Sequence, residues 1–213
     1  MPPNQQPRHT AQGAGRGAGA LLQFKITLTG IRPPIWRRVL VPEGLSLSGL
    51  HDVIQEVMGW TDSHLHDFHW RGERFGLPDP EFDEERVVDE RTVTLKELGL
   101  SIKDRLEYVY DFGDGWEHVL TVEQVLEAGE HQTPVCLKGA RSCPPEDCGG
   151  AWGYENLLDI LKDPTHEEYE EWKTWLPENF DPEQCDLAEV NRALSLKQWT
   201  LSPSSKKGRR KKV

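Results

Sequence analysis

The sequence lacks several features that would place it in a common class of protein. No run of apolar residues approaches the ~18 residues needed to span a membrane. Residues 1–20 contain no apolar core of the kind that a secretory signal peptide has. The phosphate-binding glycine motifs, the G-x-S-x-G elbow and the H-E-x-x-H motif are all missing. We therefore expect a soluble cytoplasmic protein without a recognisable catalytic signature.

Cysteine is also scarce, and none of it forms a C-x-x-C pair. The four cysteines stand at positions 136, 143, 148 and 185. An even number can indicate disulfides in a secreted protein, but nothing else in this sequence indicates secretion. We therefore predict reduced thiols or metal ligands.

The two ends of the chain carry a net positive charge, whereas the body between them is acidic. The net charge is −11, although residues 206–212 contribute +6 and residues 1–20 contribute +2. About −19 therefore remains on the body between them. A body this acidic repels nucleic acid and favours a basic protein partner, while the basic tail offers only a flexible contact with a polyanion.

The pattern of apolar residues predicts an α+β fold. Residues 113–115 read Gly-Asp-Gly between two alternating segments, which is typical of a hairpin. We expect strands at 23–29, 35–41, 65–75, 105–112 and 117–125, and helices at 47–58, 154–161, 167–176 and 186–196. This order predicts a mostly antiparallel sheet with C-terminal helices in one domain over residues 21–200, flanked by disordered arms at 1–20 and 201–213.

Several long motifs together resemble the plasmid pRiA4b ORF-3-like family. The motifs are IRPPIWRRV (31–39), GWTDSHLHDF (59–68), YDFGDGWEH (110–118), CLKGARSCPPEDCGGAWGY (136–154) and NFDPEQCDLAEVN (179–191). The resemblance covers residues 22–196. It implies an α/β roll, similar to a β-grasp arrangement, in a bacterial or archaeal setting associated with mobile genetic elements. It implies no reaction and no catalytic residues.

The cysteine-rich loop at 134–153 is one candidate metal site. Cys136, Cys143 and Cys148 stand as C-x6-C-x4-C, and we expect His118, at the end of the strand that precedes the loop, to reach it and supply the fourth ligand for structural zinc. Cys185 and Asp147 are substitutes for that fourth place. The alternative is that the three thiols pack as small apolar side chains.

A second candidate cluster joins two histidines to two aspartates. On a strand, His64 and His66 point to the same face, and Asp111 and Asp114 could add carboxylates to hold a catalytic metal ion. The alternative is that the histidines form ordinary hydrogen bonds at a sheet edge and that the aspartates only build the turn.

Two adjacent arginines are candidates for ligand binding. Arg37 and Arg38 face opposite ways on their predicted strand, and a guanidinium suits a phosphate or carboxylate. An ion pair with an acidic side chain of the body is the alternative.

These observations leave three functional hypotheses. The favoured one is a binding or interaction module with a protein partner, with structural zinc as a possible stabiliser. The alternative is a metal-dependent enzyme that uses the His/Asp cluster. Direct nucleic-acid binding through the basic tail is the weakest, because the body is acidic.

Overall fold

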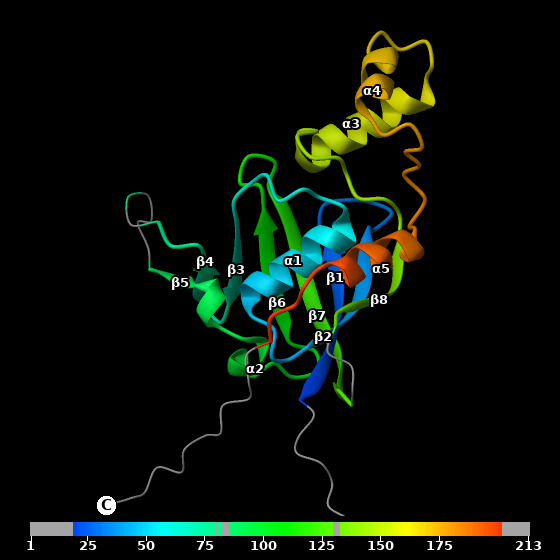
Figure 1. Cartoon of the computed structure of the whole chain (residues 1–213). Helices are drawn as coiled ribbons and strands as arrows, with labels where there is room; N and C mark the ends of the chain where they lie inside the picture. The colour runs from blue at the N-terminus through cyan, green and yellow to red at the C-terminus, as the bar shows by residue number, and fades with distance from the viewer. Residues whose placement is uncertain (1–18, 80, 82–85, 130–132, 202–213) are drawn as a thin grey trace, which may run out of the picture.

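The computed structural model describes residues 19–79, 81, 86–129 and 133–201, and it is built on one open sheet (Figure 1). The strand order is β5-β4-β3-β6-β7-β1-β2-β8, with antiparallel neighbours except for the parallel pair β4–β5. The strands are β1 (Ala20–Leu28), β2 (Trp36–Pro42), β3 (His66–Trp70), β4 (Glu73–Gly76), β5 (Val87–Asp89), β6 (Arg105–Tyr110), β7 (Trp116–Glu127) and β8 (Val135–Ala140). The predicted α+β class and mostly antiparallel sheet are confirmed, whereas the β-grasp-like roll is not confirmed.

One long helix, α1 (Leu47–Met58), covers the middle of the sheet. Ser46 caps its start by accepting a hydrogen bond from the backbone of Gly49, and Gly59 ends it with a φ of 83°. Most of the buried face is apolar, as the sequence pattern predicts. Two polar residues, His51 and Gln55, are also buried on this face one turn apart, and they become part of the site described below.

The remaining helices lie around this core. They are η1 (Glu90–Thr92), α2 (Leu95–Leu98), α3 (Gly150–Lys162), α4 (Tyr169–Trp175) and α5 (Leu187–Leu196). Helix α5 lies beside α1 and β8, while α3 and α4 form a pair beyond one end of the sheet (Figure 1). In the part of the chain that the structure describes, no helix is long and apolar enough to cross a membrane.

The structure corrects two predicted elements. The single strand predicted over 65–75 is two strands, because Arg71 and Gly72 turn the chain with φ values of 51° and 80°. The loop predicted over 134–153 contains strand β8, which the local content of cysteine, glycine and proline conceals. The hairpin at 113–115 is confirmed, with Gly115 at a φ of 67°. The predicted disordered arms fall almost wholly on residues 1–18 and 202–213, outside the described residues.

Candidate functional site

An open cleft of about 940 Å³ lies between α1, the start of β3 and the segment after β4. Three histidines line it, and they come from three different positions: the buried face of α1, the loop before β3 and the first residue of β3. They are His51, His64 and His66. Two histidines of the predicted cluster, His64 and His66, thus line this cleft together with His51.

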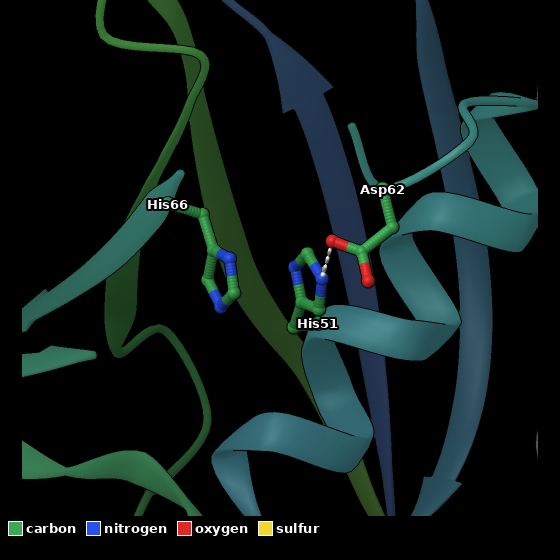
Figure 2. Close-up of side chains that lie close together, drawn as sticks. All are labelled: His51, Asp62 and His66. Atoms are coloured by element: carbon green, nitrogen blue, oxygen red, sulfur yellow. Dashed lines mark hydrogen bonds and ion pairs between the residues drawn. The ribbon is translucent and has the colours of Figure 1, made fainter. Parts of the chain in front are cut away.

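His51 and His66 are stacked on each other. Their ring centroids lie 3.5 Å apart with an interplanar angle of 4°, and Figure 2 shows the two rings side by side. Nε2 of His51 lies 2.8 Å from Oδ1 of Asp62, and Nε2 of His66 lies 2.9 Å from Oε2 of Glu90. Each ring is thus engaged by its own carboxylate.

A hydrogen-bond chain fixes the tautomer of His51. Gln55 donates to the hydroxyl oxygen of Tyr108 at 3.1 Å, and that oxygen lies 2.8 Å from Nδ1 of His51. Burial raises the pKa of Tyr108 well above its usual value, so the hydroxyl keeps its proton and donates it to Nδ1. Burial also lowers the pKa of His51, with the nearby His66 adding to the effect. A neutral His51 then donates through Nε2 to Asp62.

The stacked arrangement does not suit a shared metal ion. A histidine coordinates through a lone pair in the plane of its ring, and two parallel rings 3.5 Å apart cannot direct both lone pairs at one point. His51, Asp62 and His66 do lie close enough to hold an ion. However, the separations of 2.8 Å and 2.9 Å from their carboxylates are those of closed hydrogen bonds.

A second cluster has the spacing of metal ligands. Nε2 of His64 lies 3.3 Å from Oδ1 of Asp147 and 3.7 Å from Oδ2 of Asp111. Among the described residues this nitrogen is buried without a hydrogen-bond partner. Bonds of about 2.1 Å around a tetrahedral ion place neighbouring ligand atoms about 3.4 Å apart. The separations in this cluster match that value better than they match a hydrogen bond.

Two loops bring the aspartates to His64. Asp111 starts the hairpin turn with a φ of 56°, and its Oδ1 accepts from the backbones of Gly113 and Asp114. That leaves Oδ2 directed toward His64. Asp114 accepts from the backbone of Gly149 at 3.1 Å, which holds the loop carrying Asp147 against the hairpin.

Tyr110 lies between the two histidine clusters. Its ring centroid is 5.8 Å from that of His64 and 6.4 Å from that of His51. Its hydroxyl donates to Glu146 at 2.5 Å, and burial raises its pKa above the usual range. Tyr110 therefore stays protonated and braces both clusters.

The predicted cluster of His64, His66, Asp111 and Asp114 is brought together only in part. His64 and Asp111 lie in one cluster with Asp147, whereas His66 pairs with Glu90. Strand β3 begins at His66, so His64 lies outside the strand and the alternation of side chains does not apply to it.

The structure does not bring the predicted zinc ligands Cys136, Cys143, Cys148 and His118 together. Strands β1 and β2 lie between β7, which carries His118, and β8, which carries Cys136. Within the described part of the chain, neither cluster that could hold an ion includes a cysteine. Burial raises the pKa of the Cys143 thiol to about 11 and that of Cys148 to about 12, so both thiols are protonated at neutral pH.

The two predicted ligand-binding arginines both have internal partners. Arg37 is buried and donates to the carbonyl oxygens of Trp36, Val57 and Ala140. Arg38 forms a two-pronged ion pair with Glu123, at 2.5 Å and 2.8 Å. The guanidinium groups of both arginines therefore stabilise the fold through internal contacts.

Sequence reasoning missed His51, left Asp62 between a turn and a chemical role, and considered Asp147 only as a substitute zinc ligand. A signal for His51 was present, because His51 and Gln55 interrupt the apolar face of α1 at a spacing of four residues. Asp62 and Asp147 carry no comparable signal, since each lies in a loop whose path depends on distant contacts.

Comparison with known proteins identifies the family. The family model described as plasmid pRiA4b ORF-3-like protein matches residues 20–189. The chain belongs to this family. It is 38% identical over 176 residues to the uncharacterized protein y4hQ of Sinorhizobium fredii NGR234, covering 82% of this chain and 91% of that protein. It is also similar to the crystal structure of MM3350, a protein of unknown function from Methanosarcina mazei Go1, with a TM-score of 0.73 and 38% identity over 80% of this chain and 97% of the other.

Proposed function

We propose that this member of the pRiA4b ORF-3-like family binds a divalent ion such as zinc through His64, Asp111 and Asp147 and acts as a metal-dependent hydrolase. The observation that carries the proposal is the unpartnered Nε2 of His64, which lies 3.3 Å and 3.7 Å from two carboxylate oxygens. One nitrogen and two oxygens form a ligand set that zinc accepts in proteins.

Three protein ligands leave a coordination position for water or substrate. An ion held by these three residues would supply a nucleophile, because coordination to zinc lowers the pKa of water to about 7. His64 lines the large cleft, which places the proposed ion at the margin of that cleft. The carboxylate of Asp62, half exposed in the same cleft, is suited to accept a proton.

The charge of the cleft limits the class of substrate. Five carboxylates line it, and its two arginines each pair with an aspartate. The carboxylates belong to Asp52, Asp62, Asp67, Asp79 and Glu90. This negative surface would repel a phosphate ester or a nucleic acid, whereas it would not repel a neutral or cationic amide or ester. We therefore propose a carbonyl substrate.

This proposal differs from two predictions made from the sequence. The interaction module with a protein partner stays a prediction, and the cluster of His64, Asp111 and Asp147 favours a metal-dependent function over it. The structural zinc on Cys136, Cys143 and Cys148 also stays a prediction. The two zinc sites can be distinguished by mutation, because Cys143→Ser should remove an ion from the cysteine site and His64→Gln should remove an ion from the present one.

Elemental analysis of protein purified without a histidine tag tests the proposal. After dialysis against a slight excess of zinc and removal of free ion, we expect about one zinc per chain, as a single three-ligand site requires. His64→Gln and Asp111→Asn should each reduce this to about one tenth or less, because even the loss of a residue that only hydrogen-bonds to a ligand weakens metal binding by about 10–100-fold.

Two controls make the result specific. His69→Gln removes an exposed histidine that pairs with Asp67 outside the cluster, and it should leave the zinc content unchanged. Cys143→Ser should also leave it unchanged. Zinc that survives His64→Gln, or that is lost with Cys143→Ser, would contradict the proposed site.

A further inference from the structure

A second cavity, of about 500 Å³, lies at the other end of the molecule from the histidine cleft. It is lined by residues of α3, of α4, of the segment that follows α4 and of the β1–β2 turn. A volume of this size is within the range of small-molecule sites, which run from about 300 to 1,000 Å³.

The lining of this cavity has a net positive charge, opposite in sign to that of the whole chain. Its four cations are Arg32, Arg141, Lys162 and Lys173, and its two carboxylates are Glu178 and Glu183. The chain as a whole has a net charge of −11. A local excess of positive charge on so acidic a protein favours an anion at this place.

Arg141 is the buried cation of the set, with 6% of its surface exposed. Its Nε pairs with Glu183 at 3.0 Å, and its Nη1 donates to the carbonyl oxygen of Pro33 at 2.7 Å. Its Nη2 has no hydrogen-bond partner among the described residues. A guanidinium with two nitrogens anchored is held in place to offer the third to a ligand.

Two exposed cations of the lining, Arg32 and Lys173, are also available to bind an anion. Within the described part of the chain, neither Arg32 nor Lys173 has a carboxylate within 4.0 Å. Lys173 instead lies 5.5 Å from the ring centroid of Tyr169, which also lines the cavity. By contrast, Lys162 pairs with Asp159 at 2.7 Å.

The rest of the cavity wall is largely apolar. Leu158 and Leu161 of α3 face it together with Leu176, Phe180 and Pro182 of the segment after α4. An inorganic anion would leave these side chains without a contact. A ligand with an apolar body would cover them and gain about 25 cal/mol for each Å² of apolar surface removed from water.

We infer that this cavity binds a small organic carboxylate, with its carboxylate at Arg141, Arg32 and Lys173 and its aliphatic or aromatic body against the leucines and Phe180. Each half of the ligand matches one half of the lining. This site is separate from the histidine cleft and does not depend on the bound ion proposed there.

Calorimetric titration with three probes tests the inference on the full-length protein. Decanoate should bind with measurable heat, whereas 1-decanol, which has the same body without the charge, should bind at least about tenfold more weakly. Inorganic phosphate, which has charge without the body, should also bind at least about tenfold more weakly. If decanol binds as tightly as decanoate, the cations contribute nothing to binding. If phosphate binds as tightly as decanoate, the apolar side chains contribute nothing. Either result overturns the inference.

Charge-reversal variants locate the site. Lys173→Glu and Arg32→Glu change exposed side chains and should each raise the Kd for decanoate by on the order of tenfold. Lys138→Glu changes an exposed lysine of β8 outside the cavity and should leave the Kd unchanged. Circular dichroism verifies that the variants are folded. If folded Lys173→Glu and Arg32→Glu bind decanoate as the unmodified protein does, the carboxylate is not held here.

Discussion

Replacing His118 by leucine should make the stability of the protein less dependent on pH. The side chain of His118 is 1% exposed and lies edge-on to the ring of Trp60, with centroids 5.3 Å apart. Burial lowers its pKa from 6.5 to about 4, so the folded protein keeps this histidine neutral. In the unfolded chain the same histidine takes up a proton below about pH 6.5.

The sign and size of the effect follow from linkage. Between pH 6.5 and 4 the unfolded state binds more protons at this residue than the folded state does, so stability falls as the pH falls. At about 1.4 kcal/mol per pKa unit, His118 should cost the folded state about 2.5 kcal/mol on going from pH 7 to pH 4.5. Leucine has no proton to bind and removes that cost.

Urea unfolding of both proteins at pH 7 and pH 4.5 measures this. The difference in the free energy of unfolding between the two pH values should be about 2.5 kcal/mol smaller in His118→Leu than in the unmodified protein. Comparing differences cancels any packing change that leucine introduces equally at both pH values. An unchanged difference would show that the pKa of His118 is the same in the folded and unfolded states and would refute the reasoning.

Other substitutions test the hairpin and the arginines. Gly115→Val should lower the free energy of unfolding by roughly 1–3 kcal/mol, because a β-branched residue tolerates a φ of 67° badly; an unchanged urea midpoint would contradict this. Arg37→Met should cost on the order of 3 kcal/mol, because it strips hydrogen bonds from buried carbonyl oxygens, including that of Val57. Arg38→Gln, which breaks a partly exposed ion pair, should cost less than about 1 kcal/mol, and similar losses for both arginine variants would contradict the assignment.

Elements specified by nearby residues could be predicted from the sequence. Helix α1 begins and ends where its cap at Ser46 and its stop at Gly59 indicate, and the hairpin at Gly115 forms where the glycines indicate. Strand order could not be predicted in this way, because it depends on pairing between distant segments. The prediction for His118 assumed that its strand ends close to the cysteine-rich loop, whereas β1 and β2 separate β7 from β8, the strand that this loop contains.

The candidate site shows the same division. His64 and Asp111 were identified because each stands in a distinctive local motif. Asp147 reaches them only because Asp114 holds its loop in place, which is a tertiary contact. His51 stacks on His66 only because α1 packs across the sheet next to the start of β3. The sequence therefore supplied the residue types, and the fold determined which of them meet.

The absorption spectrum of the cobalt-substituted protein tests the central claim most directly. Cobalt(II) replaces zinc in tetrahedral sites, and thiolate ligands give it an intense near-ultraviolet charge-transfer band that imidazole and carboxylate ligands do not give. We expect visible bands of a four-coordinate cobalt site without the thiolate band, and we expect them to be lost in His64→Gln. A strong thiolate band, or a spectrum unchanged by His64→Gln, would contradict a metal centre formed by His64, Asp111 and Asp147.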